Sequence, residues 1–302
     1  MKILVAGGSG FIGSHIVDEL TKTNPAVSVR ILTRRPGPVN PSSRFRYVRG
    51  DVTAPETLAQ AVEGADAVVQ CVQFPTHPVE NSSKGWTYEN IDGQGTENLV
   101  AASARARVRR FVYLSGAGVG PGKTQPWFRA KQRAEEAVRK SGMEYVILRP
   151  SWVYGPEDRS LNRFVFFMKH LPFVPVIGSG KSRVQPVSVF DIGRVAALSL
   201  MRAEPPDATF ELGGPEELSM DEILRTVQRV MGKRRPLVHI PAGMMKLFAR
   251  ALALLPNPPL TPGAIDFVLM EVMVDPRPAE GYFGIKFEKL ETGLRRYLAT
   301  VR

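Results

Sequence analysis

The sequence predicts an α/β fold, in which a doubly wound parallel sheet is followed by a small C-terminal α/β cap domain. Two observations support this prediction. Short apolar runs alternate with helical patterns as far as Pro150, as expected for βαβ units that form a parallel sheet. Beyond Pro150, prolines and glycines become frequent and the alternation loses its regularity, which indicates a differently built region.

Each short apolar run of the first region is expected to form a strand. The expected strands span residues 2–6, 27–33, 46–48, 66–72, 110–114 and 144–148. The run at 66–72 is almost wholly apolar, as a strand covered by helices on both faces should be. The expected helices between the strands span residues 11–22, 55–62, 86–106 and 126–140.

The later region is expected to divide between two domains. Residues 1–156 form the sheet domain, and a helical pattern at 188–202 returns residues 183–205 to it. Residues 157–182 and 206–302 would then form the smaller cap, whose expected helices span residues 220–231, 243–255 and 290–298.

Composition sets the broad class of the protein. The apolar fraction of 43% and the charged fraction of 23% are ordinary globular values. We expect neither a membrane span nor a signal peptide, because no apolar run approaches about 20 residues and no cleavage site follows the first strand. Cys71 is the single cysteine, which favours a reducing, cytoplasmic setting. The histidines share no metal-ligand spacing, so no metal site is expected.

The net charge of +11 can attract nucleic acid, anionic lipid or phosphorylated ligands. The basic residues are scattered, however, and their densest run is 105–110. A solvated basic face with some steering of a charged cofactor is therefore favoured over a nucleic-acid partner.

The strongest local signal is a glycine loop directly after the first expected strand. Its glycines follow the spacing Gly7-x-x-Gly10-x-x-Gly13 and open a helix. In this context Gly7 permits a tight turn, Gly10 lets the backbone approach a pyrophosphate, and Gly13 lets the helix pack closely on the strand. The helix N-terminus offers free N–H groups to the phosphates. The loop therefore predicts a Rossmann-type site for a nicotinamide dinucleotide.

The end of the second expected strand selects between the two nicotinamide dinucleotides. An acidic residue there would hold the ribose 2′-hydroxyl of NAD. This sequence has Thr33-Arg34-Arg35 instead, and two guanidinium groups can pair with a 2′-phosphate. The sequence thus favours NADP(H), with NAD(H) and a solvent-facing arginine pair as the open alternatives.

Several motifs together resemble the short-chain dehydrogenase/reductase superfamily, in its extended or atypical branch of NAD-dependent epimerase/dehydratase-like proteins. Besides the glycine loop, the motifs are Gly50-Asp-Val52, Asn90-Ile-Asp-Gly-Gln-Gly-Thr-Glu-Asn-Leu99, Arg149-Pro-Ser-Trp-Val-Tyr-Gly-Pro156 and Gln185-Pro-Val-Ser-Val-Phe-Asp191. They cover nearly the whole chain. Within this branch the sequence is most similar to the complex I accessory-subunit type, known for binding NADPH without clear turnover.

The resemblance implies roles for particular positions. Lys131 would hold the nicotinamide ribose. The other cofactor contacts that it implies lie near the phosphates, the adenosine or the nicotinamide, and they are Phe11, Ile12, Asp51, Val52, Val72, Pro150 and Val153.

The sequence departs from the family at the residues that handle protons. The family has a Tyr four residues before the helix Lys, and this chain has Trp127 there. An indole N–H donates a hydrogen bond but is no acid or base near neutral pH. The family's Ser or Thr falls at Gly116, with Ser115 one residue early. Ser115 can reach the pocket or only satisfy backbone groups, and Tyr154 can substitute for the missing acid or only pack in its loop.

Two functions remain open at this point. One is an NADP(H)-dependent oxidoreductase or epimerase-like enzyme in which Lys131, Ser115 and Tyr154 are the candidate catalytic residues, acting on a small-molecule substrate that the sequence does not identify. The other is a non-catalytic NADP(H)-binding sensor or assembly factor. The strongly apolar segment 244–255 with its two basic residues favours packing in the cap or in a dimer, with a peripheral membrane or protein partner as the alternative.

Overall fold

The computed structural model describes residues 1–35, 44–202, 207–252, 255 and 257–298. Among these residues, the central element is a seven-stranded sheet with the order β11-β6-β5-β4-β1-β2-β3, and neighbouring strands are parallel throughout. The strands are β1 (Lys2–Ala6), β2 (Ser28–Thr33), β3 (Phe45–Arg49), β4 (Ala67–Gln70), β5 (Arg110–Leu114), β6 (Glu144–Pro150) and β11 (Ala208–Leu212). The predicted doubly wound parallel sheet is confirmed.

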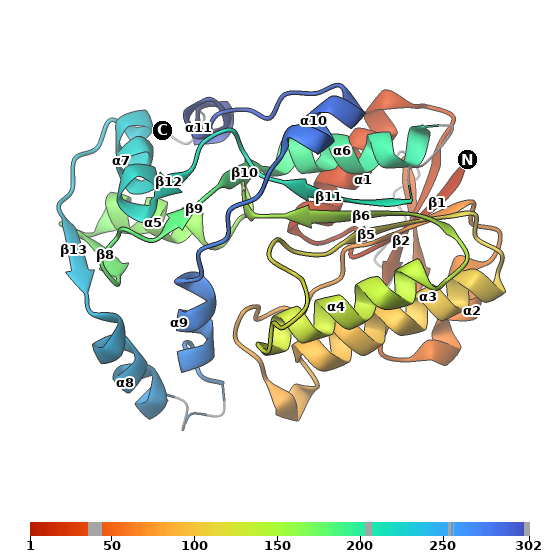
Figure 1. Cartoon of the computed structure of the whole chain (residues 1–302), viewed down its shortest axis with the longest axis horizontal. Coiled ribbons are helices and arrows are strands. Elements are labelled where there is room, and N and C mark those ends of the chain that lie inside the picture. The colour runs from red at the N-terminus through yellow and green to blue at the C-terminus, as the bar shows by residue number, and fades with distance from the viewer. Residues whose placement is uncertain (36–43, 203–206, 253–254, 256, 299–302) are drawn as a thin grey trace.

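Helices cover both faces of the sheet (Figure 1). One face carries α1 (Phe11–Thr23), α6 (Val189–Met201) and α10 (Arg277–Phe283), and the other carries α2 (Leu58–Val62), α3 (Gly95–Arg105) and α4 (Pro126–Arg139). Short 3₁₀ turns span Pro55–Thr57 and Ser82–Lys84. The helix expected at 86–106 begins instead as a π-helix, Tyr88–Gln94, which continues into α3. Mid-helix π turns are frequent at functional sites.

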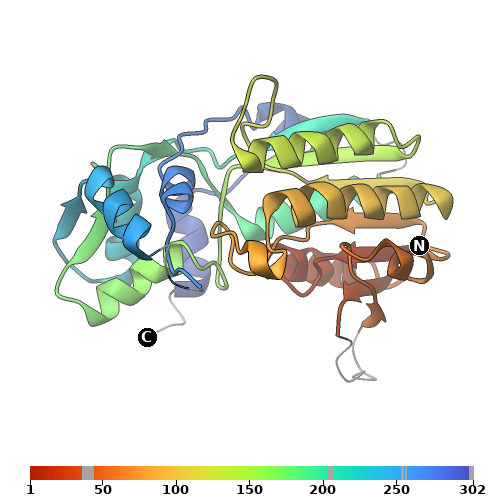
Figure 2. The same cartoon turned by 90° about the horizontal axis from the view of Figure 1, so that it is seen from below.

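The cap lies at one end of the sheet (Figures 1 and 2). It contains three strand pairs, namely β7 (Trp152–Tyr154) with β10 (Pro186–Ser188), β9 (Arg183–Val184) with β12 (Leu218–Ser219), and β8 (Val174–Ile177) with β13 (Leu237–Ile240). Its helices are α5 (Leu161–His170), α7 (Met220–Met231), α8 (Ala242–Leu252), α9 (Pro262–Val268) and α11 (Leu290–Leu298). None of the described helices has the length and apolar character needed to cross a lipid bilayer.

Two segments that we expected in the cap belong to the sheet domain. Residues 208–212 form the edge strand β11, whose Phe210 and Leu212 are buried in the same core as β1. Helix α10 adds Ala279 and Phe283 to that core. The alternation Ala-Thr-Phe-Glu-Leu suits an edge strand with one face on the core, but the sequence does not show which sheet it joins.

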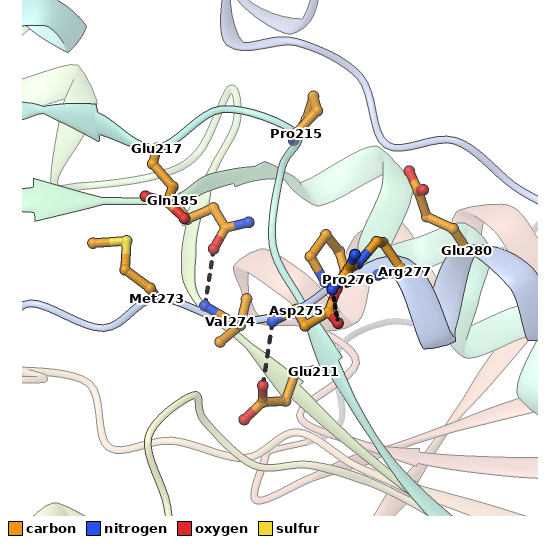
Figure 3. Close-up of a pocket in the computed structure, with 10 residues that line it drawn as sticks. All are labelled: Gln185, Glu211, Pro215, Glu217, Met273, Val274, Asp275, Pro276, Arg277 and Glu280. Carbon is orange, nitrogen blue, oxygen red and sulfur yellow. Dashed lines mark hydrogen bonds and ion pairs between the residues drawn. The ribbon is translucent and has the colours of Figure 1, made fainter.

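The chain returns from the cap to α10 across the end of β11, where a hollow of about 560 Å³ lies (Figure 3). Gln185 holds this crossing. Its Nε2 donates to the Gly214 carbonyl at 2.8 Å, and its Oε1 accepts from the Val274 N–H at 2.9 Å. The buried amide thus joins both later segments to the segment that leads into α6.

Candidate functional site

A cavity of about 1700 Å³ lies between the carboxyl ends of the sheet strands and the cap. Ligands of open parallel sheets bind at this edge, beside the point where the strand order reverses. Here that point is β1, which is flanked by β2 and β4. Every residue that the sequence assigned to the dinucleotide lines the cavity, namely Gly7, Gly10, Phe11, Ile12, Gly13, Arg34, Arg35, Asp51, Val52, Val72, Lys131, Pro150 and Val153.

The glycine loop forms one end of the cavity from backbone alone. Gly7 has φ +86°, and a Cβ there would lie 2.7 Å from the Cys71 carbonyl carbon. A Cβ on Gly13 would lie 2.1 Å from the Gly7 oxygen. Helix α1 then begins with neither a side-chain cap nor an acidic residue in its first turn, so its first N–H groups are open to an anion. These residues fit the pyrophosphate of a dinucleotide.

The next part of the cavity is basic. Arg34 and Arg35 are exposed at the end of β2, and the Arg35 N–H donates to Thr33 Oγ1 at 3.3 Å. Asp51 Oδ1 accepts from the N–H and the hydroxyl of Thr53 at 2.9 and 2.8 Å. The Asp51 carboxylate therefore stabilises its own turn. Strand β2 itself has no acidic residue of the kind that binds the ribose in an NAD site.

Lys131 extends from α4 toward the π-helix and meets a buried carboxylate. Its Nζ lies 3.3 Å from Oδ1 of Asp92, whose side chain is 1% exposed. Burial raises the pKa of Asp92, and the Lys131 ammonium opposes that rise. No motif in the sequence marks Asp92 as a partner of Lys131. The signal available was an acidic residue between Ile91 and Gly93 on the packed face of the expected helix.

Ser115 lines the cavity, but its hydroxyl is committed to another carboxylate. Its Oγ donates to Glu135 Oε1 at 2.7 Å, and Arg149 and Arg139 each donate to Glu135 Oε2 at 2.7 Å. Burial favours a raised pKa for Glu135, yet these hydrogen bonds dominate and lower it. Ser115 thus holds Glu135, and the neighbouring Gly116 leaves room for the Lys131 side chain, which a Cβ would approach at 3.3 Å.

Tyr154 lies elsewhere. It is 1% exposed and packs in the cap core with Leu161, Met168 and Leu294, and it is not among the residues that line the cavity. Burial raises the pKa of its phenol. The structure therefore does not bring this candidate acid to the site, because β7 directs Tyr154 into the cap.

The other end of the cavity is an aromatic chamber lined by Phe74, His77, Trp127 and Phe267, with the buried Tyr88 packed against the first three. The Trp127 ring centroid lies 6.0 Å from that of Tyr88 and 5.4 Å from that of Phe267. Burial lowers the pKa of His77 to about 3, so its ring is neutral at pH 7. These residues come from separate segments, which is why no sequence motif connects them.

Trp127 carries a buried polar atom that has no partner within the described part of the chain, the indole Nε1. Trp127 and Lys131 are four residues apart on α4, so they share one face of the helix. Buried donors are normally satisfied, and Trp127 is one of the residues that line the cavity.

Comparison with known proteins identifies the family. Residues 7–170, which are more than half of the chain, match the family described as NAD(P)H-binding. The 40 kDa subunit of mitochondrial NADH-ubiquinone oxidoreductase from Neurospora crassa is 26% identical over 254 residues, covering 82% of this chain and 65% of the subunit. A ceramide reductase from Caulobacter vibrioides is 28% identical over 244 residues, covering 79% and 73%.

The fold is shared with solved epimerases. UDP-glucuronic acid 4-epimerase from Bacillus cereus, solved with UDP-glucuronic acid and NAD, superposes on the full length of both chains with a TM-score of 0.77 and 21% identity. These matches confirm the resemblance to the extended short-chain dehydrogenase/reductase branch, including the complex I subunit type. The chain spans less than two thirds of the length of the Neurospora subunit.

Proposed function

The chain belongs to the NAD(P)H-binding family, and from this premise we propose that it is an NADP(H)-dependent oxidoreductase that acts on an apolar carbonyl or alcohol. One observation carries the proposal. The aromatic chamber of the cavity includes Trp127, whose buried indole N–H has no partner among the described residues, and the ammonium group of Lys131, backed by the Asp92 carboxylate, also lines the cavity. One N–H donor and one ammonium group suit a substrate that has a single oxygen atom on an otherwise apolar molecule.

The dinucleotide supplies or accepts the hydride when it is bound. The residues of the chain act on the substrate oxygen. Trp127 donates a hydrogen bond to it and thereby orients the carbonyl. Lys131 is the proton donor in reduction, because Tyr154 is in the cap and the Ser115 hydroxyl is bonded to Glu135. Asp92 stabilises the ammonium group and holds it in place.

The preferred cofactor is NADP(H), through Arg34 and Arg35. Both side chains are exposed and line the cavity, where two guanidinium groups would pair with a 2′-phosphate. Arg34→Ser/Arg35→Ser should weaken NADPH binding at least tenfold and leave NADH binding unchanged, as measured by fluorescence titration. Arg105→Ser/Lys140→Ser removes equal charge at exposed positions outside the cavity wall and should change neither. Equal NADPH and NADH affinity in the unmodified protein would refute the assignment.

A second function is favoured by the same helix. Trp127 in place of the family's Tyr, with Ser115 bonded to Glu135, fits a protein that holds NADP(H) without turnover, as a sensor or an assembly factor. The similarity to a subunit of a large respiratory enzyme supports this alternative. Under either function we propose a cytoplasmic location, in keeping with the single cysteine.

A further inference from the structure

Helix α8 presents an apolar stripe to solvent in addition to its packed side. Its inner side, with Met245 and the fully buried Ala249, packs against α9. Its outer side carries Met244, Leu247 and Phe248, which are 57%, 67% and 56% exposed. These positions, with the exposed Ala251, follow the i, i+3, i+4, i+7 spacing of one helix face. We call these four residues the outer stripe.

The segment of the sequence that contains the outer stripe is basic. Residues 223–265 contain seven Lys and Arg and no Asp or Glu. Arg250 flanks the stripe on α8 and is exposed. Lys246 is neutralised by Asp266 of α9 at 2.5 Å, so the positive charge that remains on α8 is that of Arg250.

We propose that the α8 face docks on the surface of an anionic phospholipid bilayer. An apolar stripe flanked by basic side chains is the chemistry of helices that lie in the headgroup region, and basic residues near such a surface strengthen binding by about fivefold each. At 11 residues, α8 lies along the surface and does not cross it. A second copy of this chain is the other possible occupant of the outer stripe, and the measurement of oligomeric state below distinguishes it from a bilayer.

Helix α9, which packs on the inner side of α8, reaches the cavity with apolar side chains. Val268, at the end of α9, is 40% exposed and also lines the cavity, beside Phe267 and Met270. Figures 1 and 2 both show α8 and α9 side by side at the edge of the cap. Docking through α8 therefore places the chamber wall next to the bilayer, where an apolar substrate would partition.

The test is vesicle co-sedimentation of the full chain. Binding is expected to vesicles of phosphatidylglycerol with phosphatidylcholine, to be weak with phosphatidylcholine alone, and to fall severalfold when salt screens the charges. Leu247→Ser/Phe248→Ser should lower the partition coefficient at least tenfold. The matched control Phe166→Ser removes an aromatic ring of α5 that is 55% exposed and should change binding less than twofold.

Two further measurements keep the result interpretable. NADPH titration reports whether each variant is folded, because α8 contributes no residue to the cavity wall. Sedimentation velocity reports the oligomeric state. Unchanged vesicle binding of Leu247→Ser/Phe248→Ser would overturn the proposal. So would a wild-type dimer that this variant dissociates, since the outer stripe would then be a subunit interface.

Discussion

At the α1 end of the cavity, the binding surface is backbone. Gly7 and Gly13 stand where a Cβ would collide with neighbouring main chain, and the open N–H groups of α1 need no side chain to bind an anion. At the chamber end, the binding surface is formed by side chains. Trp127 on α4 meets Phe267 from the cap and Asp92 of the π-helix meets Lys131, although these segments are far apart in the sequence.

The difference extends to two buried carboxylates, Glu135 on α4 and Asp92 on the π-helix that packs against it. Glu135 is surrounded by donors from Ser115, Arg139 and Arg149. Asp92 is equally buried, but its carboxylate oxygens have only the Lys131 contact within the described structure. A satisfied carboxylate stabilises a fold, whereas an under-satisfied one keeps capacity for a ligand or a proton.

The largest expected effect tests whether Glu135 is structural. Glu135→Ala leaves two arginines without their partner beside a buried site, and should lower the free energy of unfolding by about 3–5 kcal/mol, as measured by urea denaturation. Glu136→Ala, at the exposed neighbour on α4, should stay within about 0.5 kcal/mol. Equal losses in the two variants would remove the contrast with Asp92.

A side chain added at Gly13 tests the α1 end of the cavity, where the binding surface is backbone. Gly13→Val places atoms on the Gly7 carbonyl, and should weaken NADPH binding about a hundredfold, since α1 can no longer pack closely on β1. Gly120→Val is the control, because nothing lies within 4 Å of its Cβ position. If NADPH titration showed that both variants bind like the wild type, the role of the glycine loop in binding would be contradicted.

The chamber end can be sharpened by restoring the family's acid. Trp127→Tyr should raise NADPH oxidation with apolar ketones and aldehydes about tenfold. This is less than the ~10²–10⁴ typical of acid–base groups, because Asp92 offsets the charge of Lys131. Trp127→Phe should lower activity, since it removes the only N–H of the side chain. If turnover appears in the Tyr variant alone, the native chain holds NADP(H) without catalysis.

The smallest expected effect is that Asp92 and Glu135 change the stability of the fold with pH in opposite directions. The folded-state pKa of Asp92 is raised, so the wild type should lose stability relative to Asp92→Asn as pH rises above the unfolded pKa, about 4. The folded-state pKa of Glu135 is lowered, so the wild type should lose its advantage over Glu135→Gln as pH falls below that value. Parallel urea-denaturation profiles from pH 3 to 8, with one sign for both pairs, would show that the two carboxylates do not differ.

The features predicted from the sequence are local ones. The glycine spacing after β1 is a backbone requirement of a tight turn, and it could be recognised without any tertiary contact. The helical patterns at 220–231 and 290–298 predicted α7 and α11 with the bounds that the structure shows, Met220–Met231 and Leu290–Leu298. The segment at 208–212 was assigned to the cap because its pattern shows a strand but not its partner.

The sequence by itself determined the parallel sheet, the dinucleotide loop and the replacement of the family's acid by Trp127. Only the tertiary structure decided what surrounds that replacement. It bonded Ser115 to Glu135, buried Tyr154 in the cap and set Asp92 against Lys131. The physical reason is range: backbone geometry is encoded by neighbouring residues, whereas burial and pairing of polar side chains depend on segments that meet only after folding.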